Sequence, residues 1–322
     1  MLRNVLLLLL PLLMTPANAA VKIEKTAYAG WPNCYRITNG EVELIVTTDI
    51  GPRVIRYGFV GGQNLFKEFK EQLGKSGEKE WMPRGGHRIW IAPELVPDTY
   101  ALDNGPVKAV VKSDTIELTQ PIERETGLEK QIVVRLAPTG SNVELIHRIK
   151  NTASKPRDYA PWALTMMAQG GTGIHGFPPR GTHPKDLPPT NPLVMWAYSN
   201  LGDPRWHFTA KYMTLKQDPK ATSPQKLGSF NQHTFGAYLL GSDLFIKRYE
   251  AAPTPKGYPD FGCSFETFTS ADFLELETAG HVRTVKQGET AEHIERWSLH
   301  KNVKITSWAD AELDRVLLPF LK

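Results

Sequence analysis

The chain has 322 residues, a formal net charge of +4 and 22% charged residues. This charge is mild and the basic residues are scattered, so the composition argues against nucleic acid as a partner and favours a neutral or weakly acidic ligand. A chain near this length is compatible with a single all-β domain, because β-sandwiches often reach this size without a linker.

The first 19 residues have the pattern of a signal peptide. Arg3 supplies a positive charge, an apolar stretch follows from Val5 to Met14, and Ala17-Asn18-Ala19 forms a small-residue cleavage signal. The apolar stretch is shorter than the roughly 20 residues that a membrane-spanning helix needs. We therefore expect an exported protein, periplasmic or secreted, whose residues 20–322 form one domain that leaves the membrane after cleavage.

Short alternating or apolar runs recur along the chain and predict strands. Turn signals such as Thr38-Asn39-Gly40 and Asp103-Asn104-Gly105 separate them. The pattern favours a large antiparallel β-sandwich. The expected strands cover residues 35–38, 42–47, 53–59, 107–111, 115–119, 128–136, 142–150, 159–168, 194–198, 235–240, 244–250 and 261–267, with two more between 273 and 299.

Two connections and one helix complete the expected organisation. The stretch 66–83 is rich in Lys and Glu and suggests a solvated surface, whereas 170–192 is rich in Pro and Gly and suggests a long loop or a lid. A short C-terminal helix is predicted after Ser307. Its apolar side is formed by Leu313, Val316, Leu317 and Phe320.

The chain contains two cysteines, Cys34 and Cys263. In an oxidising compartment they could form a disulfide, but buried free thiols are equally consistent with the sequence. Zinc signatures such as H-E-x-x-H and paired C-x-x-C are absent, and the histidines do not fall at ligand spacing. We expect neither a metal nor a cofactor.

Residues 85–94, GGHRIWIAPE, form the first candidate binding segment. The indole of Trp90 could stack on the apolar face of a sugar ring, while Arg88 and Glu94 could bond its hydroxyls. The two preceding glycines permit close approach of the backbone to a ligand. A strand with one buried tryptophan and a surface Arg–Glu pair is the structural alternative.

Residues 273–299 form the second candidate segment, two strands around a glycine turn. Because side chains alternate along a strand, Glu275 and Glu277 share one face and Leu274 and Leu276 the other. Glu266, on the preceding strand, is a further carboxylate candidate. If Glu266 and Glu277 project into one cleft, they could perform acid–base chemistry or bind a cation.

The segment resembles the C-terminal end of the galactose mutarotase (aldose 1-epimerase) superfamily. Leu276-Glu277-Thr278 stands where that superfamily carries its catalytic base on a strand, and Gln287-Gly288-Glu289 stands at its Pro-Gly-Glu turn. The resemblance implies a β-supersandwich of two large antiparallel sheets with a ligand on a concave face. It also implies that Glu277 is the base.

The chain departs from this superfamily in the central strand, within residues 151–171. Mutarotases present there a histidine that protonates the ring oxygen, whereas this sequence has Trp162 and Thr165. A threonine hydroxyl cannot replace an imidazole as an acid near neutral pH. The acid would then be His87 or His281, or a histidine of the Pro-rich loop, His175 or His183.

We therefore expect an exported protein that binds a sugar, with anomer interconversion as its simplest activity. A non-catalytic carbohydrate-binding protein is the alternative, and a polysaccharide lyase a third possibility. Neither the sugar nor the oligomeric state follows from the sequence. The expected catalytic residues are Glu277, His87 and His281; the expected substrate-binding residues are Arg88, Trp90, Glu94, Trp162, Glu266, Arg283 and His175.

Overall fold

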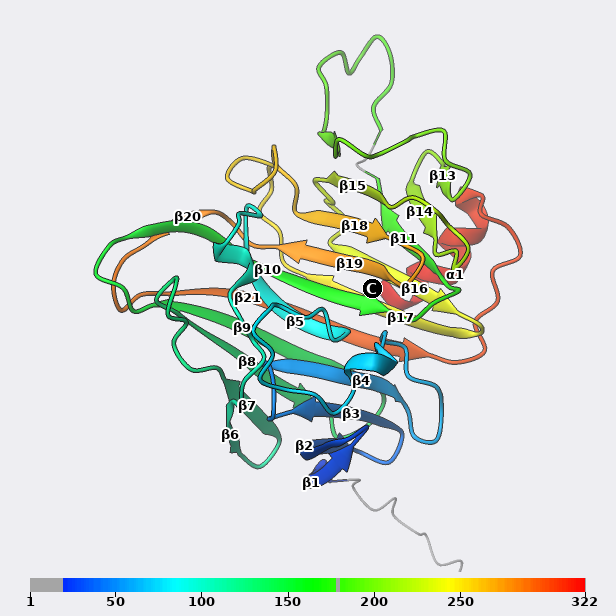
Figure 1. Cartoon of the computed structure of the whole chain (residues 1–322). Coiled ribbons are helices and arrows are strands. Elements are labelled where there is room, and N and C mark those ends of the chain that lie inside the picture. Colours follow the sequence, from blue (N-terminus) through cyan, green and yellow to red (C-terminus); the bar gives the residue numbers. More distant parts are fainter. Residues whose placement is uncertain (1–19, 178–179, 322) are drawn as a thin grey trace, which may run out of the picture.

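The computed structural model describes residues 20–177 and 180–321, and these form two large antiparallel β-sheets packed face to face (Figure 1). The expected all-β sandwich with a short C-terminal helix is confirmed. The expected signal peptide, residues 1–19, lies outside the described residues. Within the described part of the chain, no helix is long and apolar enough to cross a membrane.

The first sheet has eleven strands and carries most of the candidate residues. Its path is β1 (Lys22–Tyr28), β2 (Trp31–Thr38), β3 (Val42–Thr47), β4 (Arg53–Phe59), β5 (Gly86–Ala92), β10 (Arg157–Met167), β19 (Leu274–Ala279), β18 (Phe265–Thr269), β15 (Gln225–Ser229) and β12 (Leu193–Met195), with β20 (Arg283–Val285) paired to β10.

The second sheet has ten strands. Its order is β13 (Trp206–Phe208), β14 (Tyr212–Lys216), β11 (Thr172–Gly176), β16 (Phe235–Leu240), β17 (Asp243–Tyr249), β21 (Thr290–His300), β9 (Val143–Asn151), β8 (Leu128–Leu136), β7 (Thr115–Thr119) and β6 (Lys108–Val111).

The two sheets share one apolar core. On β19, Leu274 and Leu276 point into it, and Phe265 on β18 lies beside them. From the second sheet, Phe245 and Trp297 pack against the same core. The alternation along β19 therefore turns Glu275 and Glu277 to the outer face of the first sheet, as the sequence pattern predicts.

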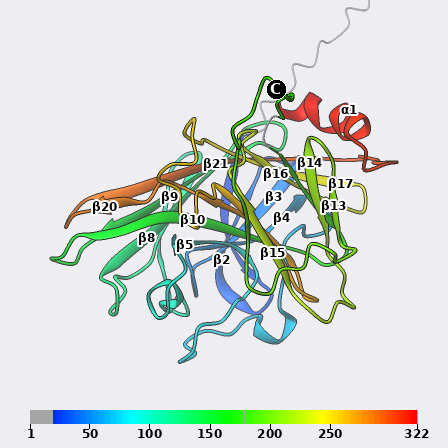
Figure 2. The same ribbon diagram turned by 90° about the horizontal axis from the view of Figure 1, so that it is seen from above.

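Helix α1 (Asp310–Leu321) covers part of the outer face of the second sheet (Figure 2). Leu313, Val316 and Leu317 pack against apolar side chains of β11, β16 and β17. At its first turn, Glu312 accepts hydrogen bonds from the Thr306 backbone and hydroxyl, which satisfies groups near the helix N-terminus. The apolar stripe in the sequence thus marks the buried side of the helix.

Two local expectations differ from the structure. The Pro-rich stretch does not begin as a loop, because Thr172–Gly176 forms β11 inside the second sheet. The stretch 66–83 is not simply a solvated surface: Phe66 and Phe69 are buried there, with a short 3₁₀-helix at Lys70–Gln72. A second 3₁₀-helix spans Asp98–Tyr100.

The two cysteines are buried free thiols. Cys34 lies on β2 and Cys263 just before β18, and both are fully shielded from solvent. Burial raises the pKa of Cys34 to about 12. These thiols pack as small apolar side chains, so the alternative without a disulfide is the one observed.

Candidate functional site

A cavity of about 440 Å³ lies on the outer face of the first sheet, over β5, β10, β19 and β18. Side chains from the sheet form its floor, and segments around Trp81, Tyr100 and Tyr198 form its walls. This volume falls within the range of small-ligand sites, which span roughly 300 to 1,000 Å³. The cavity joins both candidate segments of the sequence.

Strand register places the floor side chains next to one another. Arg88 on β5 is opposite Leu164 on β10, which is opposite Glu277 on β19, which in turn is opposite Glu266 on β18. Glu275, two residues before Glu277 on the same face of β19, lies between its cross-strand partners on β10 and β18. Side chains on neighbouring strands of one face lie within contact distance, so the sheet itself assembles this polar cluster.

Arg88 and Glu275 form the first charged pair of the floor. Nη2 of Arg88 lies 3.3 Å from Oε1 of Glu275, and the Arg88 guanidinium lies over the rings of Trp90, at 4.2 Å, and Trp81, at 5.3 Å. Burial raises the pKa of Glu275 to about 7, although Arg88 opposes the shift. A carboxyl with this pKa exchanges protons readily near neutral pH.

Lys226 on β15 is the centre of the second charged group. Its Nζ lies 2.8 Å from Oε2 of Glu266 and 3.0 Å from Oε2 of Glu277, and it also lies over the rings of Trp162, at 4.7 Å, and Trp196, at 4.6 Å. Burial alone would lower the pKa of Lys226, but the two carboxylates together raise it well above its usual range.

Glu266 balances the charge of this group. Burial raises its pKa well above the usual range, and the neighbouring Glu277 raises it further, against the opposing effect of Lys226. One cation cannot neutralise two buried carboxylates, so a proton on Glu266 leaves a neutral group of three side chains. We therefore assign Glu266 as the protonated member and Lys226 as the charged one.

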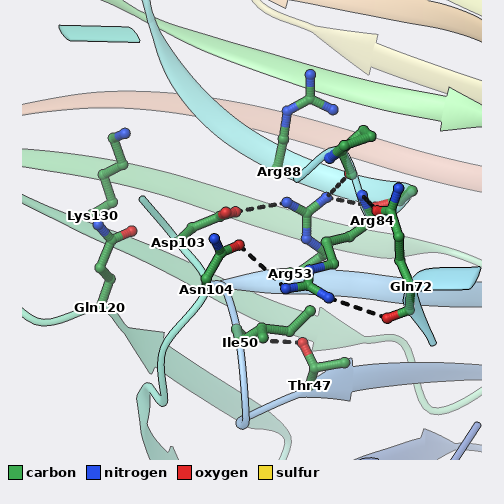
Figure 3. A network of polar contacts seen from close by, with 12 residues as sticks. Thr47, Ile50, Arg53, Gln72, Arg84, Arg88, Asp103, Asn104, Gln120 and Lys130 are labelled. Carbon is green, nitrogen blue, oxygen red and sulfur yellow. Dashed lines mark hydrogen bonds and ion pairs between the residues drawn. The ribbon is translucent and has the colours of Figure 1, made fainter. Parts of the chain in front are cut away.

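The loop that precedes β5 is anchored by two buried arginines (Figure 3). Arg53 donates to the carbonyl oxygens of Pro83 and Gly85, at 3.0 and 2.6 Å, and to Asp103 at 2.6 Å. Arg84 donates to the Gln72 carbonyl oxygen at 3.1 Å and also pairs with Glu78.

These bonds fix the segment that carries Trp81, whereas the side chain of Arg88 points away from this network (Figure 3). The chain enters β5 through a turn in which Arg84, Gly85 and Gly86 all have left-handed φ values, of 58°, 89° and 71°. A side chain at Gly85 would place its Cβ 1.9 Å from the carbonyl oxygen of Lys67. The two glycines are thus required by close backbone packing rather than by contact with a ligand.

The structure places four of the expected substrate-binding residues on the cavity, namely Arg88, Trp90, Glu94 and Trp162. Glu94 accepts a hydrogen bond from the Tyr100 hydroxyl and Arg88 pairs with Glu275, so the surface Arg88–Glu94 pair of the structural alternative is not formed. Glu266 and Glu277 lie beneath the cavity around Lys226, and Glu277 is fully buried.

The remaining expected residues lie elsewhere. His281 is exposed beyond the end of β19, with its ring against Tyr258, and Arg283 is exposed on β20, where it donates to the carbonyl oxygen of Thr290. His175 is on the second sheet, buried against Phe265 in the core. None of these three lines the cavity.

His87 also points away from the cavity, into the space between the sheets. It is fully buried, because it alternates with the outward-facing Arg88. Its Nδ1 lies 2.8 Å from the Thr165 hydroxyl, and its Nε2 lies 2.7 Å from Nε2 of His147 on β9. A side chain held in this way cannot reach a ligand on the outer face, so its expected role as an acid in the cavity is corrected.

The same space contains the one group of described residues with donor atoms close enough to suggest a metal, His87, His147 and Glu295. Their donor atoms are already engaged. His147 Nδ1 bonds the carbonyl oxygen of His293 at 3.0 Å, and Glu295 accepts from Trp297 at 2.8 Å and pairs with Lys247 at 2.7 Å. The buried ammonium beside the carboxylate also opposes a second cation, so we interpret the group as a hydrogen-bonded network.

Several cavity residues were not singled out from the sequence as ligand contacts. Lys226 comes from a short strand whose pattern gives no alternation signal, and Trp81 and Phe69 belong to the stretch expected to be solvated surface. The alternation along its strand predicts the face of Glu275 correctly but indicates no role for it. The only available signal was the presence of aromatic residues within a charged stretch, at Phe69 and Trp81.

Comparison with known proteins supports the fold. No protein-family model matches the sequence, and no curated protein matches it significantly. Solved structures do match, and they define the class of architecture as the galactose mutarotase-like fold that the sequence resemblance implied.

Three of these structures illustrate the likeness. A protein from Klebsiella pneumoniae subsp. pneumoniae described as a candidate aldose 1-epimerase superposes with a TM-score of 0.59 at 13% identity, over 92% of this chain and 86% of that one. A galactose mutarotase related enzyme from Lactobacillus acidophilus gives 0.56 at 8% identity, over 84% and 98%. A galactose mutarotase-like protein from Lactobacillus casei gives 0.54 at 10% identity, over 83% and 100%. Identities this low establish the fold and leave activity to the site.

Proposed function

We propose that the cavity binds a sugar ring and that Glu275 exchanges a proton with it, in an interconversion of anomers like that of an aldose 1-epimerase. One observation carries this proposal: buried polar atoms without a hydrogen-bond partner among the described residues gather around aromatic rings. They are Nε and Nη1 of Arg88 and the indole nitrogens of Trp81 and Trp162. Buried polar atoms are normally satisfied, and a sugar offers both hydroxyls and an apolar face.

The chemistry requires a base for the anomeric hydroxyl. In its ionised form Glu275 would accept this proton while the bond between the anomeric carbon and the ring oxygen breaks, and the ring oxygen would take up a proton from solvent water; reclosure returns both protons. Rotation of the open aldehyde and reclosure then give the other anomer. Because the pKa of Glu275 is raised to about 7, the ionised fraction and the rate should rise as pH increases through this value.

Glu275 replaces Glu277 as the proposed base for a geometric reason. Glu275 lines the cavity, whereas Glu277 is fully buried and its Oε2 is bonded to Lys226. Several structural neighbours are described as candidate aldose 1-epimerases or mutarotases, which supports a sugar-related role. The two-residue shift along one strand face keeps the carboxylate on the same side of β19.

One observation favours a second candidate function, a non-catalytic carbohydrate-binding protein. No histidine among the described residues lines the cavity, so an imidazole acid for the ring oxygen is missing. Lys226 is held by Glu266 and Glu277 and keeps its proton tightly, which makes it a poor acid. This candidate predicts sugar binding without acceleration of anomer exchange.

Proton NMR of anomer exchange separates the two candidates. Freshly dissolved α-glucose, α-galactose and other aldoses are followed with the wild type and with Glu275→Gln, Glu277→Gln and, as a control on the distant β1, Glu24→Gln. We expect acceleration that Glu275→Gln removes and Glu24→Gln preserves. If Glu277→Gln alone abolished the acceleration, Glu277 would be the base. Absence of acceleration with retained saturation-transfer signals from a sugar would favour the binding protein, and absence of both would refute a sugar site.

We also propose that the protein is exported, on the basis of the signal-peptide pattern in residues 1–19. Expression of the full chain in a Gram-negative host, followed by fractionation and mass determination, tests this. A periplasmic or secreted product beginning at Ala20 is expected, and a full-length product retained in the cytoplasm would contradict it.

A further inference from the structure

The cavity contains two separate groups of aromatic rings. The tryptophan cluster consists of Trp81, Trp90, Tyr100 and Trp162, joined by ring-centroid distances of 4.9 to 5.7 Å. The phenylalanine cluster consists of Phe69, Phe268, Phe273 and Tyr198, joined by distances of 5.6 to 6.4 Å. All eight residues line the cavity, and within the described chain no ring contact joins the two clusters.

The separation of the clusters follows from the sheet. Trp90 is on β5 and Phe268 is on β18, with β10 and β19 between them. Three strand intervals of about 4.8 Å correspond to roughly 14 Å. A pyranose ring is about as wide as an indole, so a single ring that lies on one cluster does not reach the other.

The proposed reacting group stands at the junction of the two clusters. Arg88 lies over Trp90 in the tryptophan cluster, and its Nη2 is 3.3 Å from Glu275. Glu275 is in turn the cross-strand partner of Phe268 in the phenylalanine cluster. A ligand that covers both clusters would therefore pass over Glu275, and its polar groups would meet the unpartnered Nε and Nη1 of Arg88.

We propose that the ligand is a reducing oligosaccharide of at least two rings, with one ring on each aromatic cluster and the anomeric hydroxyl of its reducing ring within reach of Glu275. This inference rests on the proposed function and specifies its substrate class. The degree of exposure agrees with it: Tyr198 is 43% exposed at one side of the cavity, while Trp81 and Tyr100 are partly exposed at the other. Aromatic rings that are accessible at both ends of a cavity provide two stacking platforms for sugar rings.

Isothermal titration calorimetry tests the proposal with matched pairs of monosaccharide and disaccharide: glucose with cellobiose and maltose, galactose with lactose, mannose with mannobiose, and xylose with xylobiose. For the preferred sugar we expect the disaccharide to bind roughly tenfold more tightly than its monosaccharide, since one further aromatic contact is worth that order of affinity. Equal affinity for both would overturn the inference and leave the sugar site intact. No binding of any pair would refute the proposed function itself.

Two variants locate the rings. Tyr198→Ala removes an exposed ring of the phenylalanine cluster, and Trp81→Ala removes a ring of the tryptophan cluster. The matched control is Phe208→Ala, a partly exposed ring on β13 outside the cavity. Thermal melting establishes that each variant is folded. We expect each cavity variant, but not the control, to weaken disaccharide binding several-fold, and the two variants to reduce monosaccharide affinity by different factors, since a single ring lies on one cluster. Equal losses for monosaccharide and disaccharide in both cavity variants would place one ring across the whole site and overturn the proposal.

Discussion

Replacing His175 by leucine should make the protein more resistant to acid. His175 is 2% exposed, and neither ring nitrogen has a hydrogen-bond partner among the described residues. Burial lowers its pKa to about 4, against the ordinary value of 6.5 that the unfolded chain should show. A proton therefore binds the unfolded state more readily than the folded state.

The size of the effect follows from this difference in pKa. The stability that neutral His175 contributes is complete above pH 6.5 and is lost as pH falls from 6.5 toward 4. Between pH 7.5 and 4.5 the loss amounts to about 2.5 kcal/mol. In His175→Leu this contribution to the pH dependence disappears. The other titrating groups, including Glu275 and His293, are common to both proteins and cancel in the difference.

Urea unfolding followed by tryptophan fluorescence measures the effect. The free energy of unfolding is obtained at pH 7.5, 6.5, 5.5 and 4.5 for the wild type, for His175→Leu and for His207→Leu, a control at an exposed position on β13. The difference between His175→Leu and the wild type should shift by about 2.5 kcal/mol in favour of the variant across this range. Parallel pH profiles would show that the His175 ring is not desolvated as described and would refute the reasoning.

Two further substitutions test the charged group around Lys226 and the backbone turn that leads into β5. Lys226→Met should destabilise the fold by about 3 to 5 kcal/mol, because it leaves the Glu277 carboxylate buried without its cation. Adding Glu277→Gln removes that charge and should restore part of the loss; urea unfolding at pH 7 measures both. A loss no larger than that of a surface substitution would contradict the assigned charges. Gly85→Ala should lower the free energy of unfolding by about 2 kcal/mol or more, since the new Cβ would meet the Lys67 carbonyl oxygen and the residue has a φ of 89°. Gly61→Ala, which has a positive φ but open space around it, should lower it by about 1 kcal/mol in the same assay. Equal costs would show that the backbone before β5 can move aside.

The sequence predicted the fold class because the alternation of apolar and polar side chains along a β-strand indicates which of its faces is buried. The same alternation put Glu275 and Glu277 on one face and Leu274 and Leu276 on the other, as the structure has them. It also applies to the segment at His87, where Arg88 faces the cavity and His87 faces the core. Knowing which of the two faces is the outer one requires the partner sheet, and for this reason a histidine of the core was expected in the site.

The parts that sequence reasoning missed depend on contacts between distant segments. Lys226 lies 51 residues from Glu277 along the chain, and no local pattern indicates that its ammonium lies between two carboxylates. Trp81 belongs to a charged stretch, yet Arg53 and Arg84 hold the neighbouring backbone so that its ring reaches the cavity. Such residues are identified by tertiary structure alone, because their environment and not their spacing gives them a role.

The polar network between the sheets determines how the two sheets align. His87 of the first sheet contacts His147 of the second, Thr278 donates across the gap to Glu295, and Lys247 donates to the carbonyl oxygen of Leu276. Apolar side chains alone would tolerate sliding of one sheet over the other. A shift by one residue pair would here break the hydrogen bonds that Lys247 and Glu295 make with the first sheet, at a cost of about 1 to 3 kcal/mol for each buried polar group left unpaired. The interior thus selects a single alignment. The strands beneath the cavity are held in place by buried charged side chains between the sheets, which make no contact with a ligand.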